Sequence, residues 1–252
     1  MTWLLTLAFD GTEYCGFQVQ PNGRSVAAAF QDALEAVIGF RPDIKGCSRT
    51  DAGVHALGFA LSFEADLRIP PEKLPLALNT KLPRDIRVLS ARVVPDGFHA
   101  RYAAHTKTYL YRIRNSPIDS PFEERYYCRI PGRLDVERMQ RAAAHFVGTH
   151  DFLALCAAHS SAAAHGDTVR TITACGAERH GDTVEITVTA DGYLYNMVRI
   201  LAGTLCEAGA CRLDPEAVPA ILASRDRRLA GPTLPAKGLF LHHVDYGKEA
   251  EG

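Results

Sequence analysis

The ten residues CSRTDAGVHA, at positions 47–56, carry the most information about the fold and function of this chain. A guanidinium, a hydroxyl and a carboxylate stand at successive positions in Arg49, Thr50 and Asp51, a combination that no hydrophobic core requires. The apolar run at 57–63 predicts a buried strand. Asp51 is therefore predicted on a loop that enters a strand, where catalytic groups are commonly held. Taken alone, the tripeptide Arg-Thr-Asp is more typical of a polar turn with a weak ion pair than of a catalytic site.

A series of further motifs favours the catalytic interpretation. Residues 49–56 resemble the active-site motif Arg-Thr-Asp-x-Gly-Val-His-Ala of the tRNA pseudouridine synthase A family, in which the aspartate is catalytic. Other segments that resemble this family follow in order along almost the whole chain: YCGFQ at 14–18, FHAR at 98–101, KTYLY at 107–111, HDF at 150–152, RTI at 170–172, NMVR at 196–199 and KGL at 237–239. One short motif arises by chance, whereas an ordered series of this length is not expected to.

The composition is that of an ordinary globular protein. Of 252 residues, 47% are hydrophobic and 23% are charged, and the length allows one large domain or two small ones. No apolar run reaches the roughly 18 residues of a membrane span, and no basic region of a secretory signal precedes the apolar start. Seven cysteines without a CxxC pair argue against a zinc ribbon or a disulfide framework. Reduced thiols of this kind predict a cytoplasmic protein.

The net charge of −1 excludes a uniformly basic surface. Any RNA-binding surface must therefore gather its cations on one face. Arg101, Lys107, Arg112 and Arg114 lie in a short stretch without acidic residues and form a candidate phosphate track. A solvated strand face is the alternative interpretation of the same residues.

Hydrophobic periodicity predicts two series of strands and helices. The first series has strands at 3–10, 57–63 and 85–94, a helix capped by Ser25 and a short helix at 71–78. The second has strands at 107–114, 168–179, 183–189 and 239–246, helices at 134–147, 193–208 and 215–223, and a hairpin turn at 180–182. Small and polar residues predict a mobile loop at 159–167.

We therefore expect an α+β fold of two lobes, each a mainly antiparallel sheet packed by helices. The predicted domains are an N-terminal lobe at 1–104, which carries the loop of Asp51, and a C-terminal lobe at 105–252. The family resemblance implies that the active-site cleft lies between the two lobes.

Asp51 is the leading catalytic candidate. An ordinary aspartate, with a pKa of about 3.9, is ionised at neutral pH and acts as nucleophile, base or electrostatic stabiliser. In a closed cleft it needs a cationic partner, since an unpaired buried charge is costly. Arg49 and Arg199 are the two candidates for this partner.

The predicted helix at 193–208 favours Arg199. Its apolar stripe faces a core, while Tyr195, Arg199 and Gly203 share a neighbouring face at a spacing of four residues. Gly203 is predicted to let another backbone approach closely, so that Arg199 reaches past it. A solvated arginine is the alternative, but the family resemblance implies that Arg199 lies beside Asp51.

The resemblance also implies the remaining site residues. Tyr109, rather than Tyr111, stacks on a uracil and assists proton transfer, and Leu239 packs on the other side of the base. Arg49 guides the extruded base or fills its vacated position. Arg101 and Lys107 are predicted to contact the RNA backbone because they lie in the stretch without acidic residues, and the resemblance includes Arg101 in its FHAR motif. A base taken from a stem or loop must be extruded at a cost of roughly a few kcal/mol and then held by stacking.

The reaction implied is the conversion of uridine to pseudouridine in the anticodon stem-loop of tRNA, at positions thirty-eight to forty. The family members act as homodimers on tRNA, and no membrane is involved. The reaction needs no redox change, phosphate transfer or net hydrolysis, so no cofactor and no metal are expected. The absence of a GxGxxG motif, a P-loop and a paired metal-ligand motif agrees with this.

Three alternative functions are compatible with parts of the sequence. FDGT at 9–12 is similar to the loop of haloacid-dehalogenase-type phosphatases, but Ala8 stands where that loop has its nucleophilic aspartate. A metal hydrolase would use His145, His150, His159 and His165, which do not follow an HExxH pattern. A non-catalytic RNA-binding module would not need Asp51, Tyr109 and Arg199 together.

Overall fold

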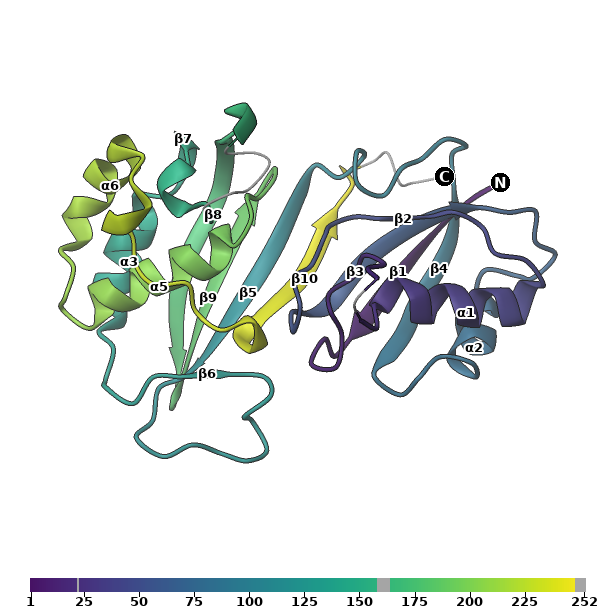
Figure 1. Cartoon of the computed structure of the whole chain (residues 1–252), viewed down its shortest axis with the longest axis horizontal. Coiled ribbons are helices and arrows are strands. Elements are labelled where there is room, and N and C mark those ends of the chain that lie inside the picture. Colours follow the sequence, from purple (N-terminus) through teal and green to yellow (C-terminus); the bar gives the residue numbers. More distant parts are fainter. Residues whose placement is uncertain (22, 158–163, 248–252) are drawn as a thin grey trace. The chain divides into compact units, whose positions relative to one another are not determined.

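The computed structural model describes residues 1–21, 23–157 and 164–247, which form two compact units. The first unit contains Met1–Thr106 together with the chain from Phe240 onward, and the second contains Lys107–Leu239. Both units combine a sheet with helices, so the predicted α+β class is confirmed. In the colours of Figure 1, the first unit is purple and blue except for the yellow strand β10.

The sheet of the first unit places the strand that follows the Asp51 loop at its centre. Its strands are ordered β4 (Ile86–Val94), β1 (Thr2–Phe9), β3 (His55–Glu64) and β10 (Leu239–Asp245), and the short β2 (Ile44–Gly46) also pairs with β3. Strand β1 is antiparallel to β3 and β4, whereas β10 runs parallel to β3, with Phe240 opposite His55. Because of this pairing, residues 240–247 belong with the first unit, although the sequence had assigned them to the second lobe.

Two helices accompany this sheet. Helix α1 (Val26–Ile38) begins as predicted at Ser25, whose side chain accepts a hydrogen bond from the Ala28 amide, and it ends at Gly39 with φ of 84°. Its buried side chains include Phe30 and Leu34. Helix α2 (Leu74–Asn79) packs against α1 and β4. It is shorter than predicted because residues 71–73 form a turn instead.

The strands of the second unit pair in a mainly antiparallel manner. Their order is β5 (Thr106–Arg114), β9 (Thr183–Ala190), β8 (Val169–His180) and β7 (Gly148–Asp151), and β6 (Cys128–Arg129) runs parallel to β5. The predicted hairpin between β8 and β9 is confirmed, with Gly181 supplying the positive φ of 60° that its turn requires.

Helix α5 (Met197–Gly209) is the central helix of the second unit. Helix α3 (Val136–Ala144), capped by Asp135, packs against both α5 and β8, and α6 (Val218–Ser224) follows the 3-10 turn Pro215–Ala217. Further 3-10 turns cover Leu153–Leu155, Arg227–Leu229 and Ala236–Gly238. The predicted start of α5 at residue 193 is wrong, because Asn196 adopts a left-handed conformation with φ of 61° and interrupts the helix there.

Two further sequence predictions concern membrane spans and the loop at 159–167. In the described residues, no helix combines the length and the apolar character that a membrane span requires. The predicted loop at 159–167 extends over positions 159–163, which are outside the described residues.

Candidate active site

The loop of Asp51 lies in the first unit and leads directly into β3. The Val54 amide donates to the Asp51 carbonyl at 3.2 Å, closing a turn in which Gly53 has φ of 76°. The side chain of Asp51 is half-buried. The predicted position of this carboxylate, on a loop at the start of a strand, is confirmed.

The segment between β1 and α1 braces this loop from one side. Phe17 donates its amide hydrogen to the Thr50 carbonyl at 3.3 Å, and Gly53 donates to the Tyr14 carbonyl at 3.2 Å. A Cβ atom on Gly16 would lie 2.3 Å from the Thr50 oxygen, so only glycine allows this approach. The motif at 14–18 therefore fixes the backbone on which Asp51 stands.

His55 ties the same loop to the end of β1. Its buried imidazole accepts a hydrogen bond from the Gly11 amide at Nδ1, at 3.0 Å, and stacks on Phe240 with ring centroids 4.7 Å apart. Oδ1 of Asp10 lies 3.1 Å from the same nitrogen. The sequence alone did not identify His55 and Gly11 as residues that hold this loop. Two features of the sequence could have indicated them. One is the histidine inside the motif at 49–56, to which no role was assigned, and the other is the Asp-Gly-Thr turn that follows β1.

Tyr14 anchors the brace to the rest of the first unit. Its hydroxyl donates to Oδ1 of Asp85 at 2.7 Å, and the Arg24 guanidinium lies 4.7 Å from the ring centroid. Burial, followed by the hydrogen bond to the Asp85 carboxylate, raises the pKa of Tyr14 well above its ordinary value. The phenol therefore remains a hydrogen-bond donor at neutral pH.

Tyr109 lies on β5 of the second unit, opposite Val188 of β9, and is 6% exposed. Its ring meets that of Tyr193 edge to face, with centroids 4.8 Å apart. The Tyr193 hydroxyl lies 2.7 Å from the Lys107 carbonyl and 2.8 Å from that of Val188. Tyr111 instead gives its hydroxyl hydrogen to the Pro235 carbonyl, and burial raises its pKa well above the ordinary value.

Arg199 is held in the second unit by the segment that precedes β10. Its Nε donates to the Leu234 carbonyl at 2.7 Å, and one terminal nitrogen donates to Oδ1 of Asn196 at 2.7 Å. A Cβ on Gly203 would lie 1.9 Å from the Pro232 oxygen, which confirms the predicted close approach of another backbone at this glycine. The two hydrogen bonds of Arg199, to the Leu234 carbonyl and to Asn196, fix the direction of its guanidinium.

Leu239 follows the Ala236–Gly238 turn at the end of the second unit and is 6% exposed. Lys237, in the same turn, pairs with Glu124. A Cβ on Gly238 would approach the Arg112 carbonyl to 2.8 Å, so the turn lies tightly against β5.

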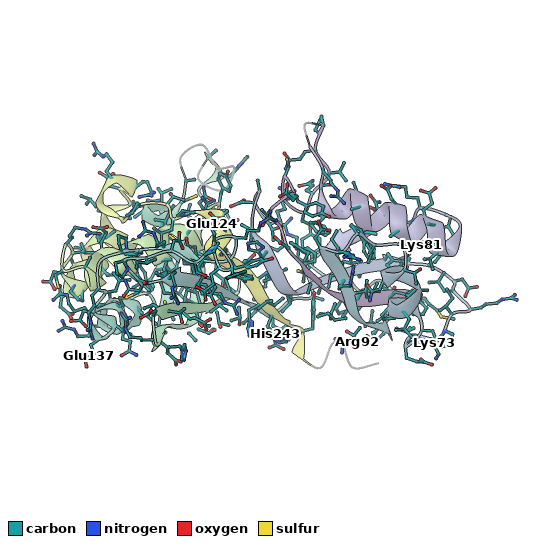
Figure 2. All side chains as sticks on the ribbon, turned by 90° about the horizontal axis from the view of Figure 1, so that it is seen from below. Lys73, Lys81, Arg92, Glu124, Glu137 and His243 are labelled. Carbon is teal, nitrogen blue, oxygen red and sulfur yellow. The ribbon has the colours of Figure 1, made fainter. Side chains whose placement is uncertain are left out.

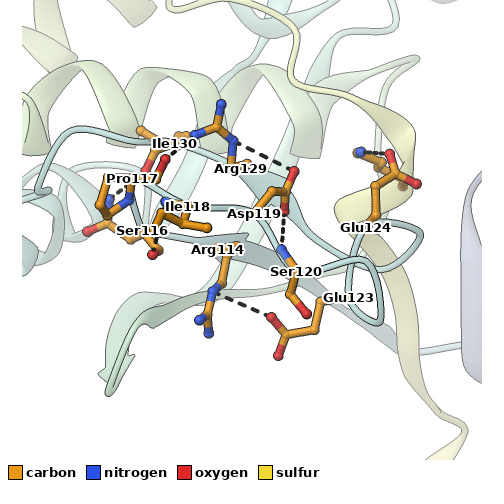
Figure 3. Close-up of polar contacts among 12 residues, drawn as sticks. Arg114, Ser116, Pro117, Ile118, Asp119, Ser120, Glu123, Glu124, Arg129 and Ile130 are labelled. Atoms are coloured by element: carbon orange, nitrogen blue, oxygen red, sulfur yellow. Dashed lines mark hydrogen bonds and ion pairs between the residues drawn. The ribbon is translucent and has the colours of Figure 1, made fainter.

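The cations of the candidate phosphate track have different surroundings. Arg101 is exposed, as is Arg49, whereas Lys107 is buried at 9% exposure. Nε of Arg112 lies 3.1 Å from Glu185, and Arg114 pairs with Glu123 and Asp182. Figure 3 shows the pair between Arg114, at the end of β5, and Glu123, in the loop between β5 and β6. These contacts do not favour a phosphate track through Arg112 and Arg114.

Surface charges of both signs occur on the molecule. In Figure 2, Lys73, Lys81 and Arg92 lie at the surface of the first unit, and Glu124 and Glu137 at that of the second. A local cationic patch, rather than a uniform field, must therefore serve any RNA ligand.

The four histidines of the metal-hydrolase alternative have separate surroundings where they are described. Nε2 of His145 lies 2.8 Å from Glu216, and Nε2 of His150 lies 3.1 Å from the Val147 carbonyl. His159 is outside the described residues. Among the residues that the structure describes, no three histidine, cysteine, aspartate or glutamate side chains gather as metal ligands.

The candidate residues thus divide between the units, with Asp51 in the first and Tyr109, Arg199 and Leu239 in the second. The predicted pairing of Asp51 with Arg199 stays a prediction.

Comparisons with known proteins identify the class that this site defines. A family model described as tRNA pseudouridine synthase matches residues 6–103 and 142–247. The chain is 47% identical over 244 residues to tRNA pseudouridine synthase A of Moorella thermoacetica, covering 96% of this chain and 98% of the relative. It is 44% identical to the protein of that name from Shouchella clausii, covering 96% and 92%. The chain therefore belongs to the tRNA pseudouridine synthase family, as the sequence motifs predicted.

Proposed function

We propose that this protein is an isomerase that converts uridine to pseudouridine in tRNA, with Asp51 as its catalytic residue. The observation that carries the proposal is the braced loop at 50–54, which holds a half-buried carboxylate at the start of β3 within the family motif. Family membership over most of the chain supports the same reaction.

The reaction rearranges one bond and needs no external reactant. The N-glycosidic bond of uridine breaks, the uracil turns within the pocket, and its C5 joins C1′ of the ribose while the C5 proton is lost and N1 gains one. Asp51 initiates the bond cleavage. The uracil must stay bound during its rotation, so the site needs surfaces that hold a flat ring.

The other candidates have roles that follow from their chemistry. Tyr109 stacks on the uracil, and Leu239 covers its other side. Arg199 supplies the positive charge that keeps the Asp51 carboxylate ionised in a site that excludes water. Arg49, which is exposed beside Asp51, guides the extruded nucleotide.

The finer substrate assignment is part of the same proposal. We place the modified uridines at positions thirty-eight to forty of the anticodon arm and expect the protein to act in the cytoplasm as a homodimer. The relatives named tRNA pseudouridine synthase A support the choice of tRNA as substrate.

The test is to incubate the purified protein with unmodified tRNA transcripts and to map pseudouridine at single-nucleotide resolution. Wild-type protein should modify the anticodon arm in the presence of EDTA. Asp51→Asn should bind the same tRNA and form no pseudouridine, because the amide keeps the shape of the carboxylate but not its charge. Full activity of Asp51→Asn would remove Asp51 from the mechanism. Binding without conversion by the wild-type protein would favour the non-catalytic RNA-binding alternative.

A further inference from the structure

The turn that follows β4 presents an aromatic ring to solvent. Tyr102 is 77% exposed, although it follows directly after the FHAR motif at 98–101. A singly exposed apolar side chain is common on protein surfaces. The surroundings of Tyr102, rather than its exposure alone, point to a function.

The backbone beneath Tyr102 is firmly held. The Ala100 amide donates to Oγ of the buried Ser62 at 3.0 Å, and the Ala100 carbonyl accepts from the hydroxyl of Tyr246 at 2.8 Å. The ring of Phe98 packs edge to face against that of Tyr246, with centroids 5.2 Å apart. The amides of Tyr102 and Ala103 both donate to the His99 carbonyl, at 3.1 and 3.0 Å. Tyr102 thus projects from a rigid turn.

Flat and cationic groups surround the exposed ring. His99 packs against Tyr102 with centroids 4.3 Å apart, and the guanidinium carbon of Arg101 lies 5.9 Å from the ring centroid. Lys45 of β2 lies opposite Ser62, the residue that anchors this turn. Lys45 also pairs with Asp43, whereas Arg101 is exposed beside the ring.

The imidazole of His99 acts as a neutral flat surface. Its Nδ1 accepts a hydrogen bond from the Arg101 amide at 3.1 Å, which requires an unprotonated nitrogen. Burial, followed by the positive charges of Lys45 and Arg101 against the opposing effects of its own backbone and Asp43, lowers the pKa of His99. Arg101 therefore remains the main source of positive charge beside the ring.

We propose that His99, Arg101 and Tyr102 form a platform on which an unpaired nucleotide of the tRNA stacks. Every base has a flat face that stacks on an aromatic ring, and a neighbouring arginine supplies the contact to its phosphate. This inference rests on the proposed function, since it names a second contact with the same substrate. It adds a base-stacking role to the backbone contact expected of Arg101.

The chain offers a matched control in a second exposed aromatic residue. Phe122, on the loop between β5 and β6, is 91% exposed but is followed directly by Glu123 and Glu124 (Figure 3). The carboxylates of Glu123 and Glu124 pair with Arg114 and Lys237 and offset those cations, so Phe122 has the exposure of Tyr102 beside balanced rather than positive charge. Removing each ring in turn separates the loss of an exposed aromatic from the loss of the platform.

The experiment measures the dissociation constant of an unmodified tRNA for the full-length protein at several salt concentrations. Stacking contributes about 1–3 kcal/mol per base, so Tyr102→Ala should raise the constant roughly 5- to 150-fold. Tyr102→Phe should restore binding, and Phe122→Ala should bind as the wild type does. Arg101→Ala should also lower the slope of log affinity against log salt by about 0.7 to 0.9. Tyr102→Ala should leave that slope unchanged, because a stacked ring releases no counterion.

Two results would overturn the platform. One is wild-type affinity of Tyr102→Ala, and the other is an equal loss in Phe122→Ala. Pseudouridine formation by the wild-type protein, measured in parallel, keeps the two proposals separate. If uridine is converted but Tyr102→Ala binds normally, the platform is wrong and the proposed function stands. If Tyr102→Ala loses affinity but the wild type converts no uridine, the proposed function is wrong and the platform stands.

Discussion

The α-carbon of Gly16 faces the Thr50 carbonyl so closely that a Cβ at this position would lie 2.3 Å from the oxygen. Gly16 also has φ of 93°, a conformation that side chains disfavour. The position of Thr50, which directly precedes Asp51, therefore depends on Gly16, a glycine more than thirty positions away in the chain.

Gly16→Ala should displace the loop of Asp51 and reduce kcat by at least about 100-fold, since shifts of about 1 Å in a catalytic group have effects of this size. Gly39→Ala is the control. Gly39 has a similar φ of 84°, but a Cβ there would meet nothing within 4 Å. Both variants carry the backbone strain, and only the first disturbs the site. Pseudouridine formation and thermal unfolding of both variants measure the difference. Equal activity in the two variants would show that the Gly16 contact does not position Asp51.

His55→Leu should leave the Gly11 amide without its acceptor. A buried donor without a partner costs about 1–3 kcal/mol of unfolding free energy. His55→Asn is the matched variant, because its amide oxygen can take the place of Nδ1. We expect chemical denaturation to show a larger loss for leucine than for asparagine. We also expect kcat to fall more in the leucine variant than in the asparagine variant, while the tRNA affinity of both changes little. An asparagine variant as impaired as the leucine variant would contradict a role for the Gly11 hydrogen bond.

Tyr14→Phe removes the hydrogen bond to Asp85 and should cost about 1.5–3 kcal/mol, because the acceptor is a carboxylate. The pKa of Tyr14 is raised on folding, so its contribution to stability is complete below the unfolded pKa of about 10 and declines as the pH rises further. The stability difference between wild type and Tyr14→Phe should therefore be constant from about pH 7 to about pH 9 and shrink above about pH 10. Denaturant unfolding at each pH measures it. A difference that grows above that pH would contradict the assignment.

The pairing of Asp51 with Arg199 is open to a double-mutant cycle. If the two charges meet, Asp51→Ala and Arg199→Ala should be non-additive in unfolding free energy by at least about 0.5 kcal/mol. Truncating one partner of a buried pair costs roughly 3–5 kcal/mol, since the other charge loses its partner. Arg49→Ala serves as the comparison, because Arg49 is exposed. Strict additivity for Arg199, with coupling to Arg49 instead, would make Arg49 the partner.

The sequence predicted most features that depend on local pattern. Apolar runs, and alternation at 107–114, located the long strands, Ser25 marked the start of α1, and Gly203 indicated a close backbone contact. It did not predict β2 and β6, because strands of three and two residues have no periodicity to detect. The left-handed Asn196 was also missed, since the apolar pattern of α5 continues through it.

Long-range pairing explains what the sequence could not show at the candidate site. The motif identified Asp51, but the contacts that hold its loop come from residues 11–17, before α1. The parallel pairing of β10 with β3 joins residues almost two hundred positions apart, and no local pattern encodes such a register. The stacking of His55 on Phe240 follows from that register alone.

The chain returns to the first unit at β10, and this return has a consequence for synthesis on the ribosome. The second unit, Lys107–Leu239, is continuous and has all its residues before Phe240 is translated, whereas the first unit waits for Phe240 and the residues after it. Domains made as uninterrupted segments fold as they emerge. The part of β10 that pairs with β3 is thus added after the second unit is made. A nascent chain that stalls before residue 240 has the whole catalytic motif but lacks the ring on which His55 rests, so translation must pass this point before an active enzyme can form.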